Sequence, residues 1–192
     1  MKDFDKFINY IESLKLYRQS RIKRWQLRDF VFEENDAEHQ LFVAQIIIII
    51  IKIFNIPENI GYKALSYGCC HDFVESTEDS LGDVNYMIKE KNPILKQLVK
   101  EQEKTAMQKV ESFYSSMIDC ENNELSNTIV NLADSIEALL YVNREIKFNT
   151  VKDEWIEIKQ EILSRLLLYW NKLNKLIIYL KRDGYIKNEK IS

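Results

Sequence analysis

The scarcity of glycine and proline limits the fold of this chain more than any other feature. Only 4 glycines and 2 prolines occur among its 192 residues, whereas a typical protein has roughly 12% of the two together. Sandwiches, barrels and glycine-rich phosphate loops depend on residues with special turn geometry. The composition therefore disfavours those folds, and we expect an all-α protein.

Helical periodicity extends along almost the whole chain. Apolar residues recur three and four positions apart, as on one face of a helix, and no linker or internal repeat interrupts them. Helices are predicted over residues 3–17, about 35–54, 58–75, 84–91, 93–119, 122–147 and 151–182, with a polar connection over 19–35 and a loop over 76–83. We expect a single domain over 1–192, with a motif-bearing core of about 20–148 and a C-terminal helical extension of about 150–182.

The most apolar run is a set of six consecutive isoleucines between Gln45 and Lys52. It is far shorter than the roughly 20 residues that span a bilayer, so we interpret it as part of a core helix that is buried nearly all round. A net charge of −3 argues against binding to a nucleic acid duplex. Three cysteines, two of them adjacent, make a poor disulfide framework and favour a reducing, cytoplasmic location. The shortness of the apolar run argues against a membrane partner.

The two histidines of the chain both lie near carboxylates. His39 shares a predicted helical face with apolar residues such as Val43, so by itself it is better interpreted as a hydrogen-bonded core histidine. The dipeptide His71-Asp72 is also weak evidence by itself, because this pairing is common.

A third element changes this interpretation. Asp134 lies in the middle of a helix that is apolar on most faces, where a lone buried carboxylate would be costly. It should therefore pair with a basic side chain, face water or bind a metal ion. Together with His39, His71 and Asp72 it predicts a site for a divalent transition metal. Glu75 follows His71 by four positions and would face the same region of a helix.

The order of these residues resembles that of a known family. The pattern H…HD…D is similar to that of the HD-domain phosphohydrolase superfamily, an all-helical fold that holds one or two metals. Five blocks spread over residues 21–145 resemble its YfbR-like 5′-deoxynucleotidase branch: Arg24-Trp25, Glu34-Asn35-x-x-Glu38-His39, His71-Asp72-x-x-Glu75, Gly82-Asp83 and Leu132-Ala133-Asp134. The resemblance therefore implies a single HD-domain helical bundle, here with a long C-terminal helix.

The resemblance also implies roles in catalysis. His39, His71, Asp72 and Asp134 match the metal ligands, and the metal would be one divalent ion of Mn, Fe, Co, Ni or Zn. Asp72 and Glu75 match the catalytic acids. Glu75 matches the residue that activates the attacking, metal-bound water and protonates the leaving oxygen.

Three further residues match substrate contacts. Arg24 is similar to the residue that binds the phosphate, and Trp25 to the aromatic residue that packs on the sugar and disfavours a 2′-hydroxyl. Asp83 is similar to the acid that binds the 3′-hydroxyl, although about three extra residues before it make Asp79 a rival. The alternatives are that Trp25 is a plain anchor to the core and that Arg24 is a solvated charge.

These observations predict a metal-dependent phosphohydrolase that removes phosphate from deoxynucleoside 5′-monophosphates. One alternative is a triphosphohydrolase that releases triphosphate from deoxynucleoside triphosphates, and another is an enzyme that hydrolyses a signalling nucleotide. An alternative of a different class is a nucleotide- or protein-binding helical module without catalysis. The resemblance is also compatible with a homodimer. The apolar stripe of residues 155–180 is better interpreted as core packing, although a helix of this length could also form a dimer face.

Overall fold

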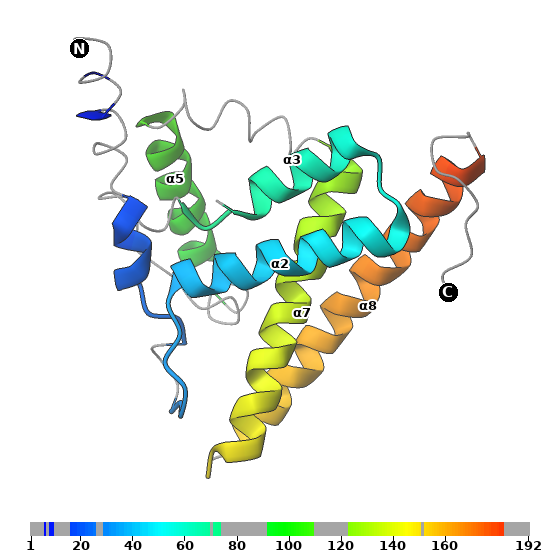
Figure 1. Ribbon diagram of the computed structural model, residues 1–192. Helices are drawn as coiled ribbons and strands as arrows, with labels where there is room; N and C mark the ends of the chain where they lie inside the picture. Colours follow the sequence, from blue (N-terminus) through cyan, green and yellow to red (C-terminus); the bar gives the residue numbers. More distant parts are fainter. Residues whose placement is uncertain are drawn as a thin grey trace.

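The structure, a computed structural model, describes residues 6, 8–9, 16–25, 29–69, 71–73, 92–109, 123–150 and 152–182. Every regular element in these ranges is helical (Figure 1). The elements are η1 (Leu16–Arg21), α2 (Asp36–Phe54), α3 (Glu58–Gly68), α5 (Pro93–Lys109), α7 (Glu124–Phe148) and α8 (Asp153–Arg182). The expected all-α fold is confirmed.

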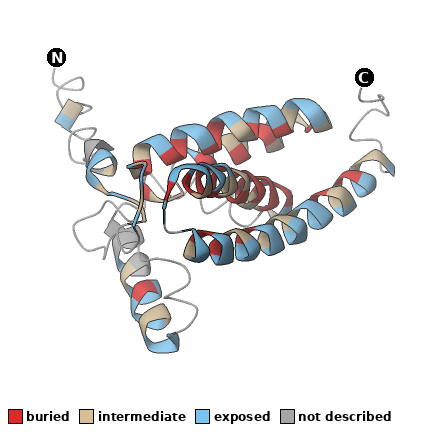
Figure 2. Ribbon diagram, turned by 90° about the horizontal axis from the view of Figure 1, so that it is seen from below, coloured by how far each residue is buried: buried red, intermediate tan, exposed pale blue. Residues whose placement is uncertain are grey.

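Helix α7 is the centre of the bundle. It runs alongside α8, while α2 crosses it and α3 packs against both α2 and α7 (Figure 1). Buried residues gather on the inward faces of the helices, and exposed residues lie on the outward faces (Figure 2). The main apolar core includes Val43 and Ile47 of α2, Ile129 and Ala133 of α7, and Leu173 of α8.

The predicted limits of α2 are confirmed, and local chemistry explains them. Asn35 is the N-cap: its side chain accepts a hydrogen bond from the backbone N–H of Glu38, whose carboxylate accepts one from the backbone N–H of Asn35. This reciprocal pair is a capping box. At the other end Asn55 adopts a left-handed conformation with φ of 50°, which ends the helix.

Helix α3 is shorter than predicted, because it ends at Gly68 and not near Glu75. A side chain at position 68 would collide with Ile47, which is fully buried in α2. Gly68 therefore permits the close approach of the two helices. Beyond it, His71 and Asp72 lie in a turn and not in the helix.

The interpretation of the isoleucine run as buried nearly all round is wrong. Ile48, Ile49 and Ile53 are exposed, because α3 and α7 cover only part of the surface of α2. By length and hydropathy alone, α2 could cross a membrane, but a core helix meets the same criteria. In this fold its buried face carries His39 and packs against α3 and α7.

Candidate functional site

The fold brings the four predicted metal ligands together from three parts of the chain. His39 lies on α2, His71 and Asp72 lie in the turn after α3, and Asp134 lies on α7. The Nε2 atom of His39 is 3.3 Å from His71 Nε2, 3.3 Å from Asp134 Oδ1 and 3.4 Å from Asp72 Oδ2. His71 Nε2 is also 3.3 Å from Asp72 Oδ2.

The donor set and its spacing fit a divalent cation. His71 Nδ1 donates to the carbonyl of Gly68 at 3.0 Å, and His39 Nδ1 donates to Glu137 at 2.7 Å. With Nδ1 carrying the retained proton of each ring, both Nε2 atoms would present lone pairs to a cation that replaces the other proton. Two ligands at about 2.1 Å from a metal are about 3.0 Å apart in octahedral and about 3.4 Å apart in tetrahedral geometry. Two imidazoles and two carboxylates suit Zn, Mn, Fe, Co or Ni.

The electrostatics of the cluster favour a positive charge at its centre. Burial alone would raise the pKa of Asp134, but His39 lowers it to about 2. Burial also opposes ionisation of Asp72, yet the charges of His71, His39 and Arg24 hold its pKa well below the usual range. Burial and Arg24 lower the pKa of His39, but hydrogen bonds to Asp134, Asp72 and Glu137 outweigh them and raise it. Both ligand carboxylates are therefore ionised at neutral pH.

Arg24 is not a solvated charge, because its side chain is only 14% exposed and lies against the ligand cluster. Its Nη1 atom donates to Asp72 Oδ2 at 3.1 Å and lies 4.0 Å from Asp36 Oδ1. Its Nε atom is 3.6 Å from Glu34 Oε2. The guanidinium of Arg24 thus lies beside the carboxylate of the candidate ligand Asp72. An anionic group bound at the candidate metal position would lie close to this guanidinium.

Trp25 is packed into a second core. Its ring stacks on Tyr141 with a centroid separation of 5.2 Å and lies 5.4 Å from the ring of Trp155. Its Nε1–H donates to Glu34 at 3.3 Å. These contacts stabilise a left-handed backbone with φ of 62°, which is unusual for a bulky residue. Trp25 therefore anchors its segment to the core, and its contact with the sugar of a substrate stays a prediction.

The remaining predicted site residues, Glu75, Asp79 and Asp83, lie outside the described residues.

The segment that carries Arg24 and Trp25 is held in place by α7. The carboxylate of Glu145, a buried residue, accepts the backbone N–H groups of Val31 and Phe32 at 2.9 and 2.8 Å.

Three buried acids lie near Arg24 or His39: Glu34, Asp36 and Glu137. Glu34 stands in one of the matching sequence blocks, but the sequence predicted no role for any of the three. Burial, followed by the nearby Glu137 carboxylate, raises the pKa of Glu34 to about 7. Glu137 follows Asp134 by one turn of the same apolar helix. Glu137 carries the same sequence signal as Asp134, since both are acids in a helix that is apolar on most faces.

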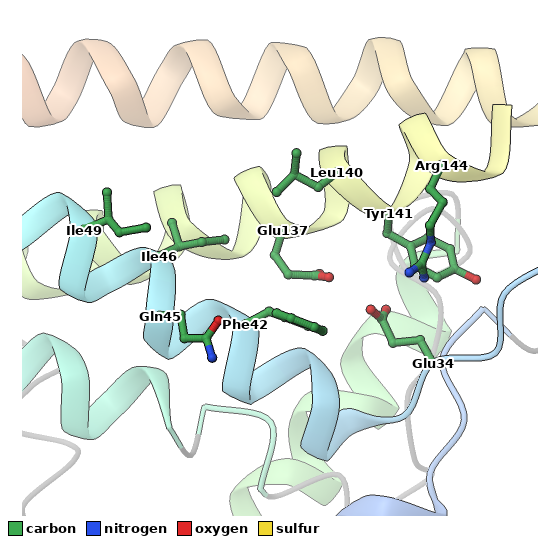
Figure 3. Close-up of a pocket in the computed structure, with 9 residues that line it drawn as sticks. All are labelled: Glu34, Phe42, Gln45, Ile46, Ile49, Glu137, Leu140, Tyr141 and Arg144. Carbon is green, nitrogen blue, oxygen red and sulfur yellow. The ribbon is translucent and has the colours of Figure 1, made fainter. Parts of the chain in front are cut away.

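A pocket of about 370 Å³ opens between α2 and α7 on the Glu137 side of His39 (Figure 3). Phe42 and Ile49 of α2 and Leu140 of α7 give it apolar walls. Glu34 and Glu137 also line it, and their carboxyl groups point towards one another.

Comparisons with known proteins agree with this geometry. A sequence profile described as 5′-deoxynucleotidase YfbR-like matches residues 6–181. No curated protein matches the chain. An HD-domain phosphohydrolase from Listeria innocua is 18% identical with a TM-score of 0.66, and the match covers 92% of this chain and 86% of that one. The cyanophage S-2L HD phosphohydrolase, bound to dA and one catalytic Zn²⁺ ion, is 18% identical with a TM-score of 0.62, over 87% and 94%.

Proposed function

Because this chain belongs to the YfbR-like 5′-deoxynucleotidase family, we propose that it removes the phosphate from deoxynucleoside 5′-monophosphates. Its class is that of the metal-dependent HD-domain phosphohydrolases. The observation that carries the proposal is the position of His39 Nε2, which lies 3.3–3.4 Å from atoms of His71, Asp72 and Asp134, while His71 Nε2 lies 3.3 Å from Asp72 Oδ2. The similar cyanophage HD phosphohydrolase is bound to the deoxynucleoside dA, which supports the substrate class.

The reaction replaces the P–O5′ bond with a bond between phosphorus and a water oxygen, and the 5′ oxygen takes up a proton. His39, His71, Asp72 and Asp134 would hold a divalent cation, which would lower the pKa of a water molecule and neutralise phosphate charge. Arg24 lies beside the ligand Asp72, so its guanidinium contacts the phosphate with two parallel N–H groups. Glu75 takes the proton from water and delivers it to the 5′ oxygen.

The deoxyribose contacts are proposed on the family resemblance. Trp25 packs against the sugar and disfavours a 2′-hydroxyl, and Asp83 or Asp79 accepts the 3′-hydroxyl. Trp25 lies next to Arg24 in the chain, so one short segment would contact both the phosphate and the sugar. The indole hydrogen bond to Glu34 and the stack on Tyr141 hold this segment against the bundle.

Product analysis by anion-exchange chromatography tests the proposal. The protein, supplied with Mn²⁺ or Co²⁺, is incubated with deoxy- and ribonucleoside mono- and triphosphates, and orthophosphate from deoxynucleoside monophosphates alone is the expected product. The Trp25→Ala variant in the same assay should narrow the preference for deoxyribose over ribose. Release of intact triphosphate would replace this proposal by the triphosphohydrolase alternative. The absence of any product would favour a binding module.

We also propose that the enzyme is a homodimer. Large apolar side chains are exposed on three adjoining helices: Phe42 and Ile49 of α2, Leu140 of α7, and Leu167 and Trp170 of α8. Monomers rarely expose contiguous apolar patches of more than a few hundred Å². Light scattering should therefore give twice the chain mass of 22.9 kDa, and Leu167→Asp should shift the mass towards that of one chain. A single-chain mass for the unmodified protein at micromolar concentration would contradict the dimer.

A further inference from the structure

Glu137 is the one acid among the described residues that contacts His39 on the side away from the ligand cluster. It lies one turn after Asp134 on α7, and only 4% of its surface is exposed. Its Oε2 atom is 2.7 Å from His39 Nδ1, a short distance for an N–H···O hydrogen bond. The His39 ring thus lies between Glu137 on one side and the candidate metal position on the other.

This contact determines which nitrogen of His39 can bind a metal. A histidine binds a metal ion as a neutral imidazole with one N–H, and a carboxylate beside Nδ1 keeps that proton on Nδ1. The lone pair then lies on Nε2, which faces His71, Asp72 and Asp134. A hydrogen bond of this kind also fixes the plane of the ring and raises the basicity of the ligand.

The two histidine ligands obtain this support in different ways. His71 Nδ1 donates to the backbone carbonyl of Gly68, which no side-chain substitution at another position removes. His39 depends on the side chain of Glu137. Glu137 also lines the pocket in Figure 3, where the carboxyl group of Glu34 points towards that of Glu137.

We infer that Glu137 is a positioning residue for metal binding: it holds His39 in the tautomer and orientation that present Nε2 to the cation. This inference rests on the proposed metal centre. Metal affinity distinguishes this role from packing alone. If Glu137 only stabilised the fold, its replacement would not change the affinity of the folded protein for a metal ion.

Zinc affinity of the full-length, metal-stripped protein tests the inference, by competition with a chromogenic chelator. Glu137→Ala removes both the charge and the hydrogen bond, so the dissociation constant for Zn²⁺ should rise by about 10- to 100-fold. Glu137→Gln retains an acceptor oxygen but loses the charge, and we expect an intermediate value. Circular dichroism verifies that each variant is folded, and the glutamine variant is the test if the alanine variant does not fold.

Glu145→Gln is the matched control. Glu145 is equally buried on the same helix, but its carboxylate accepts backbone N–H groups of Val31 and Phe32 and not a ligand. This variant should lower the unfolding midpoint and leave the zinc dissociation constant unchanged. If a folded Glu137→Ala or Glu137→Gln variant binds zinc as tightly as the unmodified protein, the positioning role of Glu137 is overturned and the proposed metal centre is not. Failure of the unmodified protein to bind zinc or any other divalent transition metal would instead overturn the metal centre itself.

Discussion

Replacing His71 by alanine is expected to abolish stoichiometric binding of a divalent metal and to lower the turnover of a deoxynucleoside monophosphate by at least about 10³-fold. A cation in such a site supplies several kcal/mol of transition-state stabilisation. His71 Nε2 lies 3.3 Å from both His39 Nε2 and Asp72 Oδ2, two other atoms of the candidate ligand set. Because it lies in a turn beyond α3, its truncation should leave the helical bundle intact.

Metal content by plasma mass spectrometry, helicity by circular dichroism and phosphate release are the three measurements. Cys69→Ala is the matched control. Cys69 lies in the same turn and is exposed, and none of its described contacts is with a candidate metal ligand. It should retain both metal and activity. A His71→Ala protein that keeps its full metal content and turnover would remove His71 from the ligand set.

Replacing Arg24 by alanine should lower the free energy of unfolding and also remove the proposed contact with the phosphate. Arg24 lies among three acids, Asp72, Glu34 and Asp36, and the last two are almost fully buried. Breaking a buried ionic cluster by removing one partner costs about 3–5 kcal/mol, because the remaining charges lose their compensation. That is a large part of the 5–15 kcal/mol by which a typical domain is stable. Urea unfolding of Arg24→Ala measures the loss in the free energy of unfolding.

Arg24→Lys separates charge from geometry. An ammonium keeps the positive charge near the acids but cannot form two parallel hydrogen bonds with a phosphate. We expect the lysine variant to recover most of the unfolding free energy but little of kcat/KM. An Arg24→Ala protein as stable as the unmodified one would show that the acids are compensated by other groups. An unchanged kcat/KM in the lysine variant would remove Arg24 from phosphate binding.

Local signals in the sequence accounted for much of the fold and for the identities of the candidate ligands. Asn35 begins α2 and Asn55 follows its end, because capping depends on residues a few positions apart. The helical spacing of apolar residues predicted α7 and α8 to within a few residues. The types and order of His39, His71, Asp72 and Asp134 were sufficient to predict a metal site.

Tertiary packing decided the features that local patterns could not. Gly68 lies where Ile47 of another helix leaves no room for a side chain, and α3 ends there, so that His71 and Asp72 lie in the turn that follows. One face of the isoleucine run is exposed because no described helix covers it. Burial of Arg24 and the contact between Glu137 and His39 join residues 48 and 98 positions apart. The sequence by itself thus determined the helices and the chemistry of the ligands, whose signals are short in range. Which polar groups lose water and which partners they gain depends on distant segments, and only the tertiary structure decided that.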